Sequence, residues 1–209
     1  RYRKVVIDPG HGGRDSGANN SKYSLKEKEL TLDLARRLKR LLETVGFEVV
    51  LTRTSDTYVS LGRRSGIANQ AQADLFISLH FNAAESSKAV GFESFVLTPQ
   101  HQASTCASKV IASDAARFRG NASDPWNMLL SYQLQGALVS HIGGTNRGVK
   151  RARFAVLKDL NCPGVLTELG FVSNPETAVK LQSSAYRKTL AQALYNGIVG
   201  YANRLKRIP

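Results

Sequence analysis

The sequence predicts an α/β protein of one domain, with a mainly parallel, twisted central sheet of about six strands flanked by helices. Three observations support this fold class. The 209 residues suffice for one domain of ordinary size with its own core. Short runs rich in Val, Ile, Leu and Phe alternate with segments of helical period, which is typical of α/β proteins. No internal repeat or low-complexity tract divides the chain, so we expect a single domain over residues 1–209.

Each expected strand is a short apolar run bounded by polar or turn-forming residues. In chain order these runs cover residues 4–7, 48–51, 74–79, 91–97, 152–157 and 164–168. Apolar residues that recur every three or four positions predict helices over residues 27–44, 61–71, 101–118, 126–142, 175–182 and 185–207. The small and polar residues 119–124, which include a glycine, predict a surface loop between two helices.

The composition is strongly basic, with 29 Lys and Arg against 16 Asp and Glu and a formal net charge of +13, so the chain should attract polyanions. Nucleic acid is not expected, because no recognised module and no interleaving of basic and aromatic residues is visible. A carboxylate-rich bacterial wall polymer fits equally well, and a basic surface that only keeps the domain soluble stays open. No apolar stretch approaches the ~18 residues of a membrane span, and residues 1–4 show no signal-peptide core. We therefore expect that any export signal has been removed.

The two cysteines, Cys106 and Cys162, form no CxxC pair and lack histidines at zinc-finger spacing. One disulfide stays possible, but two buried free thiols are the more ordinary expectation. The redox compartment is undecided on this evidence.

Three expected strands end in a group that can bind a metal or move a proton: His11, His80 and Glu168. Ligands of open α/β sheets bind beyond the carboxyl ends of the strands, so these three side chains should converge. Taken singly, a histidine at a strand end is more often a hydrogen-bonded structural residue. Their shared placement favours a functional site.

Glu27 is a further candidate, at the start of the helix expected over residues 27–44. At ~100° per residue, Glu27 lies in the middle of the apolar stripe, whereas Glu29 lies about 200° away on the wet face. A carboxylate directed into the core is costly unless it is paired, binds a metal or lies at a helix N-terminus. A simple capping role for Glu27 therefore stays open beside the metal-binding one.

Two histidines, one glutamate and an open position form a recognised set for catalytic zinc, and a separate glutamate can take the proton of the bound water. No HExxH motif is present, so this hypothesis depends on topology. A zinc exopeptidase on a similar scaffold is an alternative, although such sites often hold two metals and need more carboxylates. A wall-binding protein without catalysis is a second alternative.

Five blocks resemble, in order, the signature segments of the zinc-dependent N-acetylmuramoyl-L-alanine amidases, the AmiA/AmiB/AmiC-like family. They span nearly the whole chain: VVIDPGHGG (5–13), EKELTLDLA (27–35), LTRTSDTYVSLGRRSGIAN (51–69), ADLFISLHFNA (73–83) and FAVLKDLNCPGVLTELGFVSNPE (154–176). The resemblance implies a peptidoglycan hydrolase that cleaves the amide bond between N-acetylmuramic acid and L-alanine. We also expect a monomer, associated with the cell wall in the periplasm or outside the cell.

The same resemblance assigns roles to single residues. His11, Glu27 and His80 match the zinc ligands of the family, for one zinc per chain, and Glu168 matches its catalytic glutamate. Arg64 matches a recurrent arginine whose role is open between structural and functional. Three further polar residues in matching blocks, Asp8, Asp15 and Asn82, orient ligands or shape turns, and a turn role is favoured for Asp15.

One departure from the family concerns regulation. Some relatives are held inactive by a helix inserted after the strand that corresponds to residues 91–97, from which a glutamate reaches the zinc. Here no glutamate occurs between Glu93 and Glu168, and Asp114 and Asp124 are the only carboxylates from 98 to 146. His101 and His141 stay open as substitutes. We therefore expect a domain that needs no activator protein.

Overall fold

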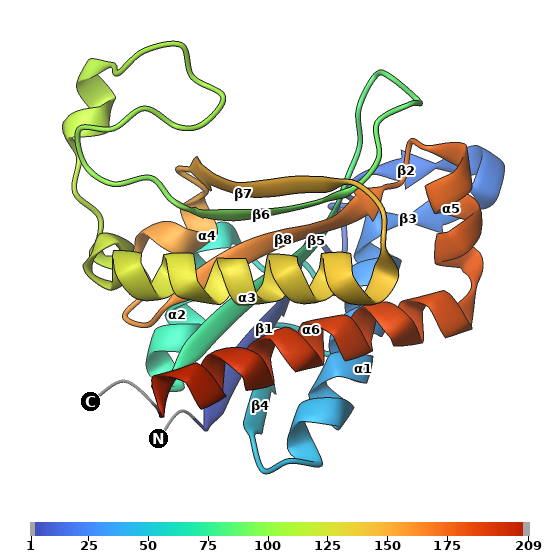
Figure 1. The fold of residues 1–209 in the computed structure, drawn as a ribbon, viewed down its shortest axis with the longest axis horizontal. Helices are drawn as coiled ribbons and strands as arrows, with labels where there is room; N and C mark the ends of the chain where they lie inside the picture. The colour runs from blue at the N-terminus through green and yellow to red at the C-terminus, as the bar shows by residue number, and fades with distance from the viewer. Residues whose placement is uncertain (1–2, 207–209) are drawn as a thin grey trace.

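The central sheet of the computed structural model, which describes residues 3–206, contains six strands. Their order across the sheet is β4 (Glu48–Leu51), β1 (Lys4–Pro9), β5 (Leu75–Asn82), β8 (Gly164–Phe171), β6 (Phe92–Leu97) and β7 (Asn146–Ala152) (Figure 1). Neighbours pair in parallel except β6 and β8, which are antiparallel, so β6 and β7 run against the other four. The predicted fold class, a mainly parallel sheet flanked by helices, is confirmed.

The helices cover both faces of this sheet. They are α1 (Glu27–Glu43), α2 (Leu61–Gln70), α3 (Asp124–Ile142), α4 (Ala155–Lys158), α5 (Pro175–Gln182) and α6 (Ser184–Leu205). Shorter pieces complete the described chain: a hairpin of β2 (Asn19–Asn20) and β3 (Leu25–Lys26), and the 3-10 turns η1 (Ser21–Tyr23), η2 (Ala112–Ala115) and η3 (Arg119–Ser123).

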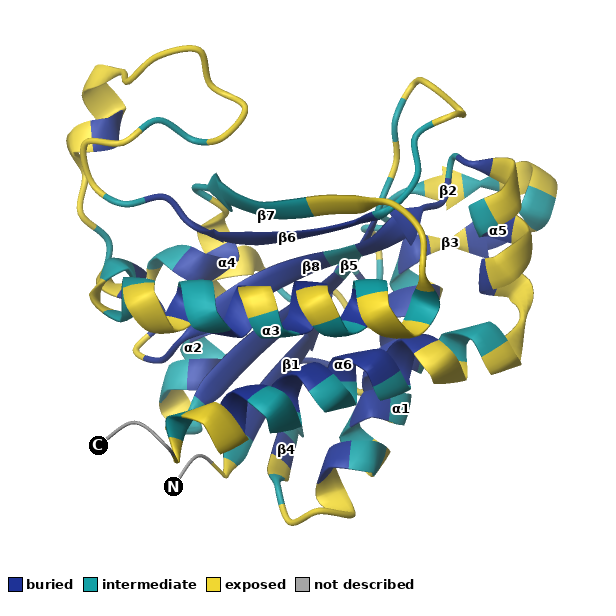
Figure 2. Ribbon diagram, viewed as in Figure 1, coloured by how far each residue is buried: buried dark blue, intermediate teal, exposed yellow. Residues whose placement is uncertain are grey.

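Two apolar clusters hold the layers together. Leu34 of α1, Leu134 of α3 and Leu194 of α6 belong to the larger cluster, on one face of the sheet. Ala68 of α2 and Val156 of α4 belong to the smaller cluster, on the other face. Because β1, β5 and β8 lie between these clusters, their residues are almost all buried (Figure 2). The carboxyl ends of these three strands are thereby held in fixed relative positions.

The prediction of a strand over residues 152–157 is wrong. The sixth strand is β7, which ends at Ala152, and the apolar run that follows forms α4, whose Val156 and Leu157 are buried against the sheet. A four-residue apolar run has too few positions to distinguish a strand from a buried helical turn. The real strand was not recognised because it is an edge strand, only partly buried and rich in Lys and Arg.

The helix expected over residues 101–118 is also wrong. This segment is irregular apart from η2, and Figure 1 shows it extending away from the sheet at the upper left. Its apolar residues Val110 and Ile111 are 51% and 56% exposed. A helix here has no apolar face to bury, and an isolated helix of this length is only marginally stable in water.

The other predicted elements are present, with ends that shift by a few residues. Residues 119–124 form η3 and the first turn of α3, and the predicted end of the last helix, Arg207, lies outside the described residues.

Both cysteines are free; Cys162 is buried as expected, but Cys106 is exposed. Within residues 3–206, no helix combines the length and the apolar character needed to cross a membrane.

Candidate active site

The loop after β1 places His11 at the carboxyl edge of the sheet. His11 has φ of 60°, in the left-handed region, and is flanked by glycines on both sides. Gly10 is needed for a different reason: a Cβ at this position would lie 2.3 Å from Cε1 of His80. The absence of a side chain at Gly10 therefore allows the two histidine rings to approach, and their centroids are 4.9 Å apart.

The Arg64 side chain anchors this loop by hydrogen bonds. It is buried, and its Nη1 donates to Asp8 Oδ1 at 2.7 Å and to the carbonyl of Pro9 at 2.9 Å, while its Nη2 donates to the carbonyl of His11 at 2.9 Å. Asp8 is fully buried and also accepts a hydrogen bond from Ser78 Oγ. These contacts are structural, and they fix the backbone that carries His11.

Arg53 has a similar function that the sequence analysis missed. Its guanidinium donates to the carbonyls of Pro9, Gly10 and Lys28, at 3.0, 2.9 and 2.7 Å. It thereby joins the β1 loop to the first turn of α1. One signal was available in the sequence, since Arg53 is the second residue after the strand Glu48–Leu51 and therefore lies at the same edge of the sheet.

Glu27, the first residue of α1, lies between the two histidines. Its Oε1 is 3.1 Å from Nε2 of His11 and 2.9 Å from Nδ1 of His80. Two backbone N–H groups fix the carboxylate, that of Phe81 to Oε1 at 2.9 Å and that of Ala18 to Oε2 at 2.8 Å. Glu27 is therefore more than a helix cap, because its side chain is directed at the two imidazoles.

In this cluster the pKa shifts favour the ionised form of Glu27 and the protonated form of His11. Burial alone would raise the pKa of Glu27, but hydrogen bonds from His11 and His80 lower it to about 2. For His11, burial alone would lower the pKa, and the bonds to Glu27 and Asp15 outweigh it and raise the pKa. Asp15 accepts from Gly17 N, as the predicted turn requires, and also lies 2.9 Å from Nδ1 of His11. It therefore orients this ring and leaves Nε2 for another partner.

His11, Glu27 and His80 fit a metal ion. Each offers one ligand atom, and these atoms lie within 4.8 Å of one another; no other such group of His, Cys, Asp or Glu occurs within residues 3–206. Two imidazole nitrogens and one carboxylate oxygen at this separation need only a small adjustment to surround a tetrahedral ion with bonds of ~2.0–2.2 Å. Glu29 takes no part, since it is exposed and pairs with Lys26.

Glu168 lies beside this cluster, opposite His80 in the register of β5 and β8. Its Oε2 is buried without a hydrogen-bond partner in the described chain. Burial raises the pKa of this carboxyl to about 7, and the charges of Glu27 and Glu93 act in the same direction. A carboxyl with a pKa near neutrality in such a place is suited to accept and return a proton.

A hollow of about 340 Å³ opens above the cluster. The metal-binding cluster, Glu168 and Asn82 form the polar part of its lining. Leu61, Phe154 and Val156 form apolar walls. Phe154 and Leu61 are 36% and 55% exposed, so these two walls of the hollow are in contact with solvent.

No residue from 98 to 146, all of which the structure describes, lines this hollow. Asp114 is not on a surface helix as expected; it is buried and pairs with Arg153 at 2.6 Å. Asp124 lies in the first turn of α3, near the predicted helix start, and pairs with Arg151 at 2.7 Å. The carboxylates of this segment are thus engaged elsewhere.

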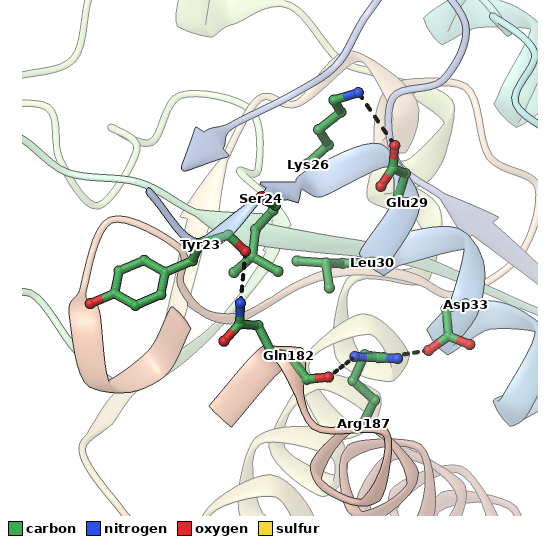
Figure 3. A pocket seen from close by; sticks show the side chains of 9 residues that line it. Tyr23, Ser24, Lys26, Glu29, Leu30, Asp33, Gln182 and Arg187 are labelled. Carbon is green, nitrogen blue, oxygen red and sulfur yellow. Dashed lines mark hydrogen bonds and ion pairs between the residues drawn. The ribbon is translucent and has the colours of Figure 1, made fainter. Parts of the chain in front are cut away.

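A larger hollow of about 480 Å³ lies on the other side of the α1 N-terminus, between it and the α5–α6 junction (Figure 3). Its charged side chains pair with one another, since Arg187 donates to Asp33 at 2.6 Å and Lys26 lies 3.6 Å from Glu29. This hollow offers a ligand few unpaired polar groups.

A sequence profile described as N-acetylmuramoyl-L-alanine amidase matches residues 5–200. The chain is 39% identical over 197 residues to the N-acetylmuramoyl-L-alanine amidase LytC of Bacillus subtilis, a match covering 94% of the chain and 35% of LytC. It is 33% identical over 218 residues to the amidase AmiC of Escherichia coli, covering 94% of the chain and 52% of AmiC. The chain thus spans between about a third and a half of the length of these two relatives.

Solved structures agree with this similarity. The CwlD amidase from Clostridioides difficile, in complex with the GerS lipoprotein, superposes with a TM-score of 0.81 at 29% identity. The superposition covers 97% of this chain and 99% of CwlD. It supports the predicted fold class independently of the sequence patterns.

Proposed function

This chain belongs to the N-acetylmuramoyl-L-alanine amidase family, as its sequence blocks predicted, and we propose that it hydrolyses peptidoglycan between N-acetylmuramic acid and the L-alanine of the stem peptide. The observation that carries this proposal is the convergence of His11, Glu27 and His80 beside the partnerless carboxyl of Glu168. Three ligands, an open position and a proton carrier are the parts that metal-assisted amide hydrolysis needs.

In this proposal His11, Glu27 and His80 hold one zinc ion per chain. Zinc is favoured over magnesium or calcium because two of the three donors are imidazole nitrogens. When bound, zinc supplies a Lewis acid that lowers the pKa of a water molecule towards ~7 and polarises a carbonyl group. Asp15 supports this arrangement, because its contact with Nδ1 of His11 leaves Nε2 to face the ion.

Glu168 is the proposed general base. It takes a proton from the attacking water and later gives it to the departing nitrogen of L-alanine. In the metal-free protein burial raises the pKa of this carboxyl to about 7, which makes it a better proton acceptor than an exposed glutamate.

We propose that the domain is a monomer that acts on the cell wall, in the periplasm or outside the cell. Its net charge of +13 supports attraction to a carboxylate-rich polymer. We also propose that it needs no activator, since residues 98–146 direct no carboxylate at the hollow. Independence from an activator requires a direct test, because CwlD was solved in complex with a lipoprotein.

Digestion of sacculi by the zinc-loaded domain, followed by mass spectrometry, tests the reaction. We expect intact stem peptides with a free L-alanine amino terminus; peptides shortened from an end would indicate the exopeptidase alternative. Glu168→Gln should keep its zinc and lose ~10²-fold or more of the rate. Near-parent activity of this variant would show that another group is the base.

Two further measurements address the metal and the regulation. Zinc content should fall in His11→Ala and in His80→Ala, and full occupancy of both variants would contradict the ligand assignment. Hydrolysis should be the same with and without partner extracts. Activity that appears only with a partner, or only after a deletion within residues 98–142, would contradict independence from an activator.

A further inference from the structure

A buried acid with two cations lies one strand beyond Glu168. Glu93 of β6 is 4% exposed, and it accepts hydrogen bonds from Asn82 Nδ2 at 2.8 Å, from Arg147 Nε at 2.8 Å and from Lys150 Nζ. Burial alone would raise the pKa of Glu93, but the bonds from Lys150 and Arg147 outweigh it and lower the pKa. The group therefore has one negative and two positive charges.

Both cations keep donors that Glu93 does not use. A guanidinium has five N–H groups and an ammonium three. The two cations also lie over aromatic rings, Arg147 over Phe171 at 4.9 Å and Lys150 over Phe95 at 5.7 Å. Both side chains are partly exposed, 36% for Arg147 and 19% for Lys150. Arg147 Nη1 also donates to the carbonyl of Val90 at 3.4 Å, which leaves its Nη2 and the remaining N–H groups of Lys150 as free donors on a group with net positive charge.

This group lies close to the proposed base. Glu93 and Glu168 are directly opposite in the antiparallel register of β6 and β8, so their side chains share one face of the sheet. The Cβ atoms of opposite residues are ~4.5–5.5 Å apart, and Lys150 and Arg147 both bond to the Glu93 carboxylate, so the two cations lie within roughly 10 Å of the Glu168 carboxyl. Asn82 lines the hollow and donates a hydrogen bond to Glu93, so it connects the hollow with this charged group.

The proposed reaction sets the direction of the substrate. Because Glu168 protonates the departing alanine nitrogen, the stem peptide extends from the hollow on the side of β8 and β6. A Cα–Cα step of ~3.8 Å places an α-carboxylate on the second peptide residue ~6 Å from that nitrogen. Such a carboxylate is thus within reach of the cations that bond to Glu93.

We infer that Arg147 and Lys150 form a subsite for the carboxylate of the second residue of the stem peptide, with Glu93 as a positioning residue that holds both cations. This inference rests on the proposed function. The alternative is a purely structural role, in which the cluster only pins the edge strand β7 to β6. Only the subsite predicts a preference between a carboxylate and its neutral amide.

The test uses two N-acetylmuramoyl tripeptides that differ only in a carboxylate or a carboxamide on the second residue. For the parent enzyme we expect kcat/KM to favour the carboxylate about 10-fold, as for a charge-assisted hydrogen bond. The ratio should fall towards one in the double variant Arg147→Met/Lys150→Met, and Lys150→Arg should retain part of it. Lys188→Met removes an exposed lysine from α6, on the opposite face of the sheet, and should keep the preference.

Equal kcat/KM of the parent for both substrates, or an unchanged ratio in the double variant, would overturn the subsite. Calorimetry of the free tripeptide with zinc-loaded Glu168→Gln separates this result from a failure of the proposed reaction. About 10-fold weaker binding once Arg147 and Lys150 are also replaced supports the subsite even if neither substrate is cleaved. Equal binding, or no binding before their replacement, overturns it.

Discussion

Replacing Glu168 by Gln should stabilise the zinc-free domain, and only above a certain pH. In the folded protein the pKa of this carboxyl is about 7 because burial penalises the charged form, against an ordinary value of 4.5. Between pH 4.5 and 7 the folded state therefore holds a proton that the unfolded state has released. Rising pH in this window lowers the free energy of unfolding of the parent domain. Glutamine carries no such proton and avoids this loss.

The size of the effect follows from the pKa shift. A rise from 4.5 to about 7 corresponds to about 3 kcal/mol at most, since one pKa unit is ~1.4 kcal/mol. The advantage of Glu168→Gln should be smallest near pH 5, grow up to pH 7 and stay constant above it. The amide also lacks a partner for its buried atoms, but this cost is the same at every pH.

Urea unfolding in the presence of a chelator at pH 5 and pH 8 measures this change. Titrations of other groups cancel when the variant is compared with the parent at each pH. Glu85→Gln, which alters an exposed carboxylate in the loop after β5, is the matched control and should show no pH-dependent difference. A gap between Glu168→Gln and the parent that is the same at both pH values would refute the reasoning.

Three further predictions concern the metal and its loop. Glu27→Gln should weaken zinc binding by more than the ~10–100-fold of an outer-shell contact, whereas Glu29→Gln should not, as chelator competition would show; equal effects would contradict the assignment. Gly10→Ala should displace His80 and lower zinc affinity while circular dichroism stays unchanged, and unaltered affinity would show that the contact yields easily. Arg64→Lys should destabilise the domain by about 2–4 kcal/mol in urea, because lysine keeps the charge but loses the buried fork; a loss below 1 kcal/mol would argue against it.

The part of the fold predicted from the sequence is the part in which burial determines the residue type. β1, β5 and β8 lie between two apolar layers, so their sequences are continuous apolar runs. The edge strand β7 escapes this rule because its side chains are only partly buried, and its sequence is polar. Residues 101–118 have apolar residues at helical spacing but form no long helix, because this segment has no core to cover.

The site was predicted as far as strand ends and a helix face determine it. His11, Glu27, His80 and Glu168 were selected in this way, and the structure brings them together. Glu93 was not, because its position opposite Glu168 depends on β6 running antiparallel to β8. No local pattern in the sequence reports the direction of a strand, and pairing across the sheet is a long-range property.

Arg53 and Arg64 both hold the loop after β1 by hydrogen bonds, and this determines whether the domain needs metal in order to fold. In small zinc modules the ion organises the chain, and chelation unfolds them. Here the backbone that presents His11 is tied by buried hydrogen bonds that involve no ion. Stripping the metal should therefore leave a folded apoprotein that recovers on simple addition of zinc, without refolding. Under the proposed function and location, the domain would fold before it receives its ion, and the zinc concentration around it would then set the active fraction.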